Sequence, residues 1–282
     1  MTQLVSVVVP VFNGMPHLRD LAESILGQTH TELDVVFVDG GSTDDSAGYL
    51  ATLTDSRVRV LSRPPGTTAA QNWTAASEAA QAEFVKLICQ DDLLKPDAIE
   101  KQRADLLANP SAVMAIAQRD VIDAKGDLLY SSRGCAGLKN GVMNGTSALM
   151  AAYLQGTNIF GEPLAVLFRR EPLMAALPWD DTDPFLLDLA LYAKVARGGD
   201  VVVRRESIGA FRVSAGSWST RLLGEQVRQF ERWQAAFAAS LPELPSPAER
   251  IRAKAGLHAQ ALLRRAAYRW LRAKGSFRSG AV

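Results

Sequence analysis

Cysteine and histidine are scarce in this sequence, which holds two cysteines and three histidines among its 282 residues. Cys89 and Cys135 lack CxxC spacing and the histidines lack metal-ligand spacing, so neither a redox motif nor a histidine-based metal centre is indicated. No uncharged apolar run reaches about 18 residues, and the first residues lack the basic and apolar segments of a signal peptide. We therefore expect a cytoplasmic protein in a reducing compartment.

Strong charge of either sign is also missing, because 31 basic and 30 acidic residues leave a formal net charge of +1. This balance gives no general attraction to nucleic acid, and no nucleic-acid partner is expected. Three common motifs are absent as well. The turn after the first apolar run reads PVFNGMP in place of GxGxxG, and the sequence has neither GxxxxGK[ST] nor GxSxG. A dinucleotide-binding domain, a P-loop ATPase and an α/β-hydrolase are therefore disfavoured.

The first 110 residues alternate between apolar runs and amphipathic stretches. The first run, VSVVVPVF at 5–12, is apolar and rich in β-branched residues, which is typical of a strand covered on both faces. The apolar runs lie at 5–12, 33–39, 57–62 and 83–90. Helical patterns separate them, and Ser42 or Thr43 is expected to cap the second helix. The order βαβαβαβ predicts a mostly parallel sheet with helices on both faces, in which ligands bind outside the carboxyl ends of the strands.

The pattern changes after residue 110. Lys125-Gly126 is expected to form the turn of a hairpin, and further strand and helix patterns follow. They include predicted strands at 162–170, 200–205 and 207–213. From about residue 221 the chain is helical and rich in alanine and arginine, with a linker at 241–247. We predict one α/β catalytic domain over 1–220, with a nucleotide-binding half at 1–110 and an acceptor half at 111–220. A helical C-terminal region would then occupy 221–282.

Two adjacent carboxylates, Asp91 and Asp92, follow the fourth predicted strand in the segment LICQDDLLKP. Neighbouring acids repel each other, and a divalent cation that also binds a nucleotide diphosphate would relieve that repulsion. One acid would then reach a ribose and the other the metal. The alternative is a solvated acidic turn in which Asp92 stabilises the start of a helix.

Four segments in order and spacing resemble the inverting glycosyltransferase family 2, which has the GT-A fold. They read VSVVVPVFNG, VDGGSTDDS, GTTAAQNW and LICQDDLLKP. The resemblance implies transfer of a sugar from a uridine- or thymidine-diphosphate sugar to an acceptor hydroxyl, with inversion and with Mn²⁺ or Mg²⁺ as cofactor. The acceptor is expected to belong to cell-envelope polysaccharide or glycolipid biosynthesis.

The resemblance also implies a donor site. The nucleobase pocket would be lined by Pro10, Val11 and Phe12, with Asn13 just beyond them. Asp39 would accept the imide N–H of uracil or thymine. Two departures from the family pattern are visible: an extra glycine in VDGGSTD, where a second acid is common, and Gln90 in place of the first acid of the metal motif.

The remaining donor contacts come from later segments. By the same resemblance, Asn72 would lie near the ribose or sugar, Asp91 would bind the ribose or sugar, and Asp92 would bind the metal. Arg212, in the segment FRVSAGSWS at 211–219, would contact the pyrophosphate. The alternatives are a helix-surface position for Asn72 and a turn or capping position for Asp39.

The catalytic base of an inverting transfer is a carboxylate that takes the proton of the acceptor hydroxyl. The family usually carries Glu-Asp ahead of a helix, and here Asp188 stands in the acid's place with Leu187 before it. Asp183 and Pro184 are expected to start this helix, which would put Asp188 in its second turn. The rivals for the base are Asp180, Asp181 and Asp183, and a helix-dipole acid is the structural alternative.

Two other functions and one localisation stay open from the sequence. A sugar-nucleotidyltransferase usually carries a glycine-rich basic loop after the first strand, which PVFNGMP lacks; a catalytically inactive nucleotide-sugar-binding module is the second alternative. The strongly basic stretch 248–278 groups Ile251, Ala255, Leu262 and Ala266 on one helical side and Lys254, Arg265 and Arg272 on another. This pattern fits either a membrane-interface helix at the inner face of the membrane or a solvated helix packed on the domain.

Overall fold

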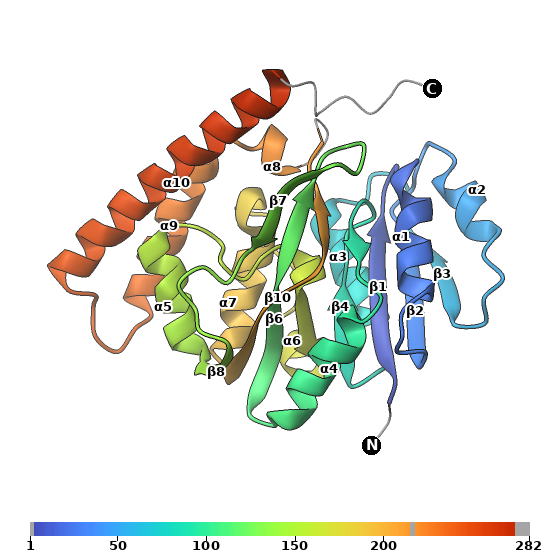
Figure 1. Ribbon diagram of the computed structural model, residues 1–282, viewed down its shortest axis with the longest axis horizontal. Coiled ribbons are helices and arrows are strands. Elements are labelled where there is room, and N and C mark those ends of the chain that lie inside the picture. Colours follow the sequence, from blue (N-terminus) through green and yellow to red (C-terminus); the bar gives the residue numbers. More distant parts are fainter. Residues whose placement is uncertain (1–2, 215–217, 274–282) are drawn as a thin grey trace.

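A computed structural model describes residues 3–214 and 218–273, and Figure 1 shows one central sheet flanked by helices. The sheet has ten strands. They are β1 (Val5–Val11), β2 (Leu33–Asp39), β3 (Val58–Ser62), β4 (Phe84–Leu87), β5 (Leu93–Leu94), β6 (Ala112–Ile122), β7 (Leu128–Arg133), β8 (Gly141–Asn144), β9 (Val166–Arg169) and β10 (Asp200–Arg212).

Ten α-helices surround this sheet within the described residues. They are α1 (His17–Leu26), α2 (Ser46–Ala51), α3 (Ala69–Glu78), α4 (Ala98–Ala108), α5 (Gly145–Gln155), α6 (Arg170–Ala176), α7 (Leu187–Ala196), α8 (Trp218–Arg221), α9 (Gln226–Ala239) and α10 (Pro247–Ala273). Short 3₁₀ turns at Pro163–Ala165 and Pro184–Leu186 precede β9 and α7.

The nucleotide-binding half has the parallel arrangement predicted from the sequence. The order β3-β2-β1-β4 is parallel throughout, so β1, β2 and β4 end at the same edge of the sheet. Alternate residues of β1 point to opposite faces: Val7 and Val9 pack with α1 and α4, while Val8 packs with α3. Burial on both faces explains why β1 and β2 read as largely apolar runs in the sequence.

The second half of the sheet is mixed. β9 runs antiparallel to both β4 and β6, and β10 runs parallel to β6, so β9 joins the two halves. β6 and β7 form the expected hairpin. The two strand patterns predicted near residues 200–213 are one strand, β10, whose register against β6 shifts at three places. These register shifts let one continuous strand pair with β6 along both predicted segments.

The C-terminal helices pack on the domain through a close backbone contact. Gly156 follows α5 with a left-handed backbone, and a Cβ there would lie 2.2 Å from the backbone nitrogen of Leu257 in α10. A Cβ on Gly256 would in turn lie 2.7 Å from the carbonyl oxygen of Leu154. Leu257 and Phe237 are buried in the same core as Val8. Small residues therefore set how closely α10 approaches α5. No described helix is long and apolar enough to span a membrane.

Two helix starts differ from the sequence prediction. The second helix begins at Ser46, with Asp45 at the capping position, because the hydroxyl of Ser42 donates to Asp39 instead of capping the helix. The helix expected from Pro184 begins at Leu187, because a 3₁₀ turn, closed by the Leu186 amide donating to the Asp183 carbonyl at 2.7 Å, comes first.

Candidate active site

The carboxyl ends of β1 and β2 are joined by a small set of polar side chains. The Oδ1 atom of Asn13, which has a left-handed φ of 52°, accepts the backbone amide of Thr43 at 2.7 Å. The backbone amide of Asn13 donates to the Ser42 hydroxyl at 2.9 Å. Ser42 in turn donates through its amide, at 3.2 Å, and its hydroxyl to Asp39. These bonds hold the loop after β2 against the end of β1.

Asn72 lies beneath these strand ends and is buried. Its Nδ2 donates to the carbonyl oxygens of Val11 and Val38, each at 3.1 Å, and so ties β1 to β2 from α3. Its Oδ1 is buried without a partner among the described residues. Asn72 is therefore not a helix-surface residue. Its contact with a ribose or sugar stays a prediction.

Gln90, which replaces the first acid of the family's metal motif, holds the end of β1. Its Oε1 accepts the backbone amide of Phe12 at 2.6 Å, and its Nε2 donates to the carbonyl of Phe12 at 2.8 Å. A carboxylate could not make the second bond, because it has no donor when ionised. Phe12 itself is 53% exposed, so its ring stands free at the rim beside Pro10 and Val11. Glutamine at the position of the family's first acid thus holds the backbone of Phe12 through two hydrogen bonds.

Asp92 and Arg212 meet although they come from opposite ends of the domain. The backbone amide of Arg212, the last residue of β10, donates to Oδ1 of Asp92 at 3.1 Å. The Arg212 guanidinium donates to the carbonyl of Asp91 at 2.9 Å and lies 3.8 Å from Asp20. Asp92 is completely buried, and its Oδ2 has no partner among the described residues. Arg212 thus secures the acidic turn with its backbone and side chain.

Burial disfavours the negative charges of Asp91 and Asp92. Burial raises the pKa of Asp92 well above its usual range, and the negative charge of Asp91 adds to that rise. Burial also raises the pKa of Asp91, against which the positive charge of Arg212 acts. Buried carboxylates need a cation or a hydrogen-bond donor to remain ionised. The unpartnered Oδ2 of Asp92 is therefore an oxygen that fits a divalent cation.

No complete metal site is built from protein side chains alone. Over residues 3–214 and 218–273, no three histidine, cysteine, aspartate or glutamate side chains are arranged to hold a metal ion. A cation held by one or two carboxylates, with substrate phosphates and water completing its shell, matches this donor set.

Asp188 lies in the first turn of α7, one turn earlier than expected, because the helix begins at Leu187. Its Oδ2 accepts a hydrogen bond from the Asn158 amide at 2.8 Å, and its Oδ1 accepts the backbone amide of Leu189 at 2.6 Å. Burial raises the pKa of Asp188 to about 7, the charge of Glu162 adds to the rise, and the bonds from Leu189 and Asn158 oppose it. A carboxyl group with this pKa exchanges protons near neutrality.

The rival acids of the preceding loop have other contacts. Asp180 accepts bonds from the amide and hydroxyl of Thr182, at 2.9 and 2.6 Å, and these bonds lower its pKa. Asp183 forms an ion pair with Arg232 of α9. Asp181 is exposed. The lowered pKa makes Asp180 a weaker base, and the ion pair with Arg232 occupies Asp183, so these contacts favour Asp188.

Four residues near Asp188 were not identified from the sequence. Arg119 of β6 forms a two-bond ion pair with Glu162, in which its second amino group donates at 2.8 Å. Asn158 orients Asp188, and Arg264 of α10 donates to Thr157 beside it at 3.1 Å. The partners are far apart in sequence, so only the fold brings them together. Glu162 begins a predicted strand, and its acidic character was the one available signal.

The acidic residues after β4, Asp188 of α7 and Glu162 before the 3₁₀ turn lie close enough to Cys89 to act on the charge of its thiol. Burial raises the pKa of the Cys89 thiol, and the charges of Asp92, Asp91, Asp188 and Glu162 each add to the rise. Trp73 and Trp179 pack against each other edge to face, with ring centroids 5.0 Å apart.

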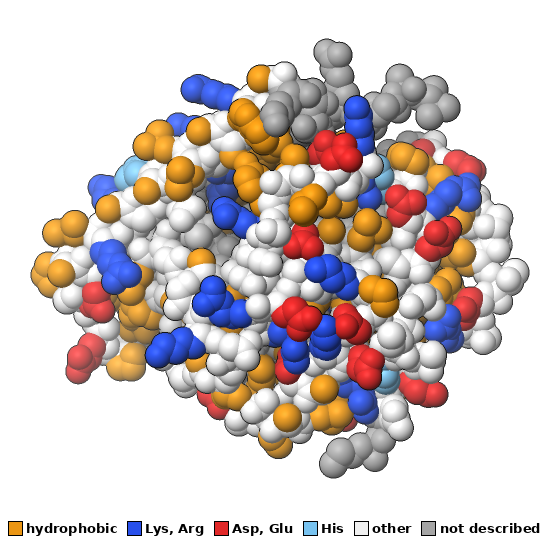
Figure 2. Space-filling view, viewed as in Figure 1, with side chains coloured by type: hydrophobic (Ala, Val, Ile, Leu, Met, Phe, Trp, Pro, Cys, Tyr) orange, Lys and Arg blue, Asp and Glu red, His pale blue; other side chains and the backbone are white. Residues whose placement is uncertain are grey.

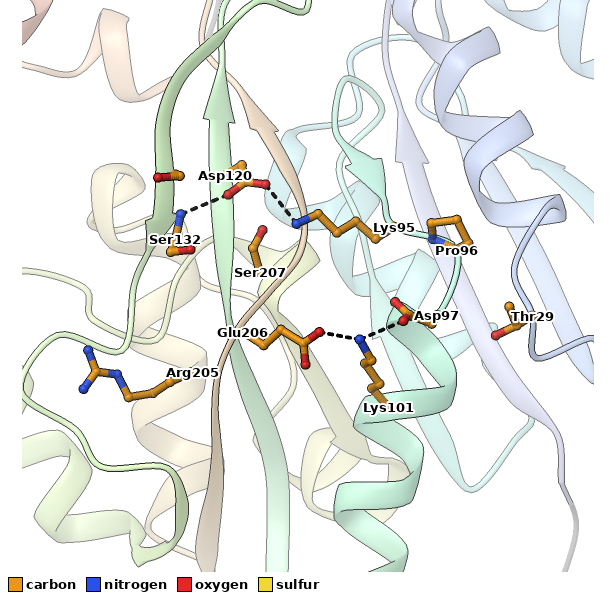
Figure 3. A pocket seen from close by; sticks show the side chains of 11 residues that line it. Thr29, Lys95, Pro96, Asp97, Lys101, Asp120, Ser132, Arg205, Glu206 and Ser207 are labelled. Atoms are coloured by element: carbon orange, nitrogen blue, oxygen red, sulfur yellow. Dashed lines mark hydrogen bonds and ion pairs between the residues drawn. The ribbon is translucent and has the colours of Figure 1, made fainter.

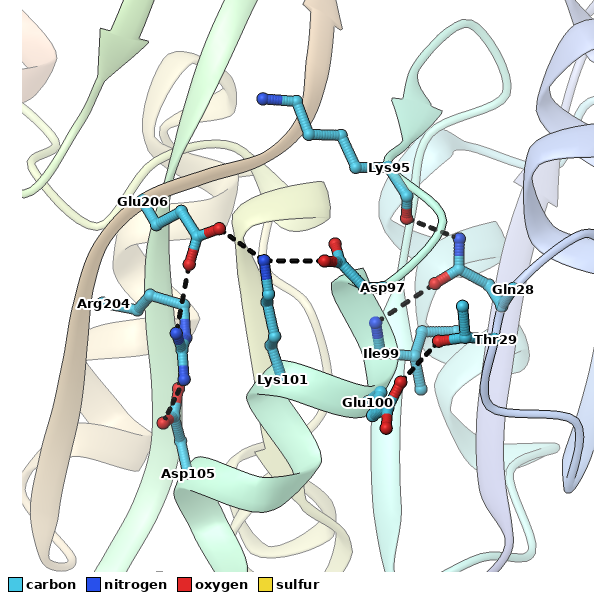
Figure 4. A network of polar contacts seen from close by, with 10 residues as sticks. All are labelled: Gln28, Thr29, Lys95, Asp97, Ile99, Glu100, Lys101, Asp105, Arg204 and Glu206. Carbon is cyan, nitrogen blue, oxygen red and sulfur yellow. Dashed lines mark hydrogen bonds and ion pairs between the residues drawn. The ribbon is translucent and has the colours of Figure 1, made fainter.

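A cavity of about 780 Å³ lies elsewhere, on the α4 side of the sheet (Figure 3). Its charges pair with one another: Lys95 lies 3.0 Å from Asp120, and Lys101 bridges Asp97 and Glu206. The same side chains belong to a network that joins β10, α4 and the end of α1, where Gln28 donates to the Lys95 carbonyl at 2.8 Å (Figure 4). Internal pairing gives this cavity a structural role.

Comparison with known proteins identifies the family. The sequence profile described as glycosyl transferase family 2 matches residues 6–175, more than half of the chain. The chain belongs to glycosyl transferase family 2. Glycosyltransferase GlyG of Streptococcus pneumoniae is 36% identical over 102 residues, which cover 36% of this chain and 34% of GlyG. The uncharacterised MT1568 of Mycobacterium tuberculosis is 27% identical over 234 residues, covering 81% and 73%.

Solved structures agree with the family 2 fold. TarS of S. aureus, solved with UDP-GlcNAc, superposes with a TM-score of 0.67 at 15% identity and covers 90% of this chain and 71% of that one. The mannosyltransferase PcManGT from Pyrobaculum calidifontis, solved with GDP-Man and Mn²⁺, gives a TM-score of 0.62 at 20% identity, covering 98% and 76%. At these identities the likeness is one of fold, and the GT-A prediction is confirmed.

Proposed function

We propose that this family 2 glycosyltransferase moves a sugar from a uridine- or thymidine-diphosphate sugar to an acceptor hydroxyl, with inversion at the anomeric carbon. The observation that carries the proposal is that Oδ2 of the buried Asp92 is without a partner among the described residues, while Asp91, Asp92 and Asp188 all lie close enough to Cys89 for their charges to raise its pKa. One pair of acids suits a diphosphate with its cation, and the third suits an acceptor hydroxyl. TarS was solved with UDP-GlcNAc, which supports a uridine donor.

Asp188 would act as the general base. Its carboxylate takes the proton of the acceptor hydroxyl while the acceptor oxygen forms its bond to the anomeric carbon. The bond from that carbon to the diphosphate oxygen breaks on the opposite face, and the diphosphate leaves with the electron pair. A pKa of about 7 is matched to this work near neutral pH. Asn158 would hold Oδ2 and orient the carboxylate.

Asp92 Oδ2, with Asp91 beside it, would hold Mn²⁺ or Mg²⁺. When bound, the cation neutralises charge on the diphosphate. The structural neighbour PcManGT was solved with Mn²⁺. On the nucleoside side, the ends of β1 and β2 would form the base pocket, with Asp39 as acceptor for the imide N–H. Asn13 and Gln90 would keep that pocket in shape through their bonds to Thr43 and Phe12.

The acceptor is proposed to be a cell-envelope polysaccharide or glycolipid. One relative, TuaG of Bacillus subtilis, is named for teichuronic acid biosynthesis and is 34% identical over 101 residues, which cover 35% of this chain and 40% of TuaG. The outer face of α10 gives a second argument, because Ile251, Leu262, Leu263 and Trp270 are 45–71% exposed. Figure 2 shows hydrophobic and basic side chains intermixed along this helix. Such a face suits an anionic membrane surface.

A ligand panel tests the proposal. Uridine, thymidine, cytidine and guanosine diphosphates are added with and without Mn²⁺, and the rise in melting temperature is measured, since a ligand stabilises the folded state by RT ln(1 + [L]/Kd). We expect the largest rise with UDP or dTDP plus Mn²⁺. Release of UDP from a UDP-sugar then separates a transferase from an inactive binding module, and formation of a nucleotide sugar from a sugar phosphate would instead identify a nucleotidyltransferase.

A further inference from the structure

Arg264 of α10 reaches from the C-terminal helix into the region beside Asp188. Its guanidinium donates to Oγ1 of Thr157 at 3.1 Å and to Oε1 of Gln226, and it lies 5.1 Å from the ring centre of Phe185. The contacts are two neutral oxygens and an aromatic face. Among the residues that the structure describes, no carboxylate forms an ion pair with it, although Glu162 and Asp188 are close enough to act on its charge.

Two of the three segments that Arg264 contacts lead directly to Asp188 or to its hydrogen-bond partner. Thr157 is followed directly by Asn158, which donates to Asp188 at 2.8 Å. Phe185 lies in the 3₁₀ turn that leads into Asp188. Arg264 therefore stands on the Asp188 side of the site, whereas Arg212 stands at Asp92.

Close packing of α10 on α5 brings Arg264 to this position, and its contacts with Thr157, Gln226 and Phe185 then hold the guanidinium. Gly156, next to Thr157, allows α10 to approach at Leu257, two helical turns before Arg264. Burial lowers the pKa of Arg264 against the attraction of Tyr268, Glu162 and Asp188. A guanidinium has five donors, and two are used by these neutral partners. Figure 2 shows a hollow beside α10 with basic side chains in it.

We infer that Arg264 is the anion-binding residue of an acceptor subsite, and that the acceptor carries a carboxylate or a phosphate close to the hydroxyl that receives the sugar. A planar guanidinium held in place by Thr157, Gln226 and Phe185 binds either oxyanion through two parallel hydrogen bonds. The subsite rests on the proposed transferase function, because Asp188 is the base there. It adds a chemical class for the acceptor.

The test measures binding of two simple anions to the UDP- and Mn²⁺-loaded protein by calorimetry. Glucuronate supplies a carboxylate and glycerol 3-phosphate supplies a phosphate. We expect one of the two to bind, and Arg264→Gln to weaken that binding at least about 10-fold, the scale of a lost charge-assisted hydrogen bond. Arg264→Lys keeps the charge without the fork and should lose less. The affinity for UDP should stay within about twofold in both variants.

Arg265→Gln is the matched control. Arg265 follows on the same helix but is exposed and lines a separate cavity with Arg269 and Arg272. If the control loses the anion and Arg264→Gln does not, the anion belongs to these outer arginines and the inference is overturned. Equal loss of UDP and anion in Arg264→Gln would assign Arg264 to the donor diphosphate and also overturn it.

The two proposals fail separately. If UDP binds the wild-type protein but neither anion binds, the acceptor subsite is wrong and the donor site stands. If UDP does not bind, the proposed function is wrong, and titration of the anions into the free protein still decides whether Arg264 binds them. Melting temperatures of both Arg264 variants near the wild-type value establish that the measured losses come from the site.

Discussion

The backbone amide of Arg212 donates to Oδ1 of Asp92 at 3.1 Å, and the second oxygen of that carboxylate is buried without a partner among the described residues. Half of the carboxylate is thus fixed by the protein, and half is left for another ligand. A buried carboxylate oxygen without a donor is costly, and a cation removes that cost. This arrangement makes the acidic turn a candidate for binding a diphosphate together with its cation.

Asp92→Asn is expected to abolish cation-dependent binding of UDP while the fold is kept. The amide oxygen of asparagine can still accept the Arg212 amide, and because burial raises the pKa of Asp92, a neutral side chain removes a charge that the interior disfavours. Calorimetric titration of UDP with and without Mn²⁺ measures the effect. Asp97→Asn, in the separate cavity beyond α4, is the matched control. An Asp92→Asn protein with unchanged Mn²⁺ dependence would show that the cation binds elsewhere.

Gln90→Ala is expected to weaken UDP binding, because it removes both hydrogen bonds that hold the backbone of Phe12. The neutral bonds are each worth about 1 kcal/mol, so a loss of up to about 30-fold is expected. Gln90→Glu restores the acid common in the family but loses the donor to the Phe12 carbonyl and adds charge beside Asp91. It should therefore bind UDP less tightly than the wild type. Unchanged UDP affinity in both variants would show that the hydrogen bonds between Gln90 and Phe12 do not shape the base pocket.

Uridine diphosphate is expected to bind better than cytidine diphosphate if Asp39 reads the imide N–H of the base. A hydrogen bond to a charged acceptor contributes about 2 kcal/mol, which is roughly 30-fold in affinity. Asp39 already accepts two bonds from Ser42, and a carboxylate has about four lone-pair positions, so it retains capacity for a third. Equal calorimetric affinities for the two nucleotides would remove Asp39 from the base pocket.

The outer face of α10 is expected to bind anionic vesicles in a salt-dependent manner. Leu262→Glu places a negative charge on the apolar side of the helix, at a side chain that is 65% exposed, and should abolish flotation with vesicles that contain phosphatidylserine. Leu244→Glu is the control, because Leu244 is 68% exposed in the 241–247 linker. Absence of binding by the wild-type protein would retire the membrane proposal.

The sequence was sufficient for the fold because its signals were local. Val5–Val11 and Leu33–Asp39 are almost wholly buried, and both read as largely apolar runs in the sequence. The neighbouring parallel strands also explain why acids predicted at separate strand ends, Asp39 and Asp92, come to one edge. The boundary at residue 220 and the roles of the site residues stay predictions.

The parts that could not be predicted depend on contacts between distant segments. Asn72 reads as a surface residue until β1 and β2 are neighbours, because its two acceptors are the carbonyls of Val11 and Val38. The capping prediction for Ser42 was wrong because Asp39 takes its hydroxyl. Arg264 gave no signal at all in a basic helix. Residues 215–217 of the predicted Arg212 segment, and 274–278 of the basic stretch, lie outside the described residues.

The central claim is that Asp188 removes the acceptor proton, and its pH profile is the most direct test. The pKa of about 7 requires turnover to rise about tenfold per pH unit below 7 and to level off above it, because only the ionised form is a base. Asp188→Asn should lower kcat at least about 100-fold with unchanged UDP affinity, and the product of the wild-type enzyme should have inverted anomeric configuration by NMR. Near-normal turnover by Asp188→Asn, or a product with retained configuration, would contradict this mechanism.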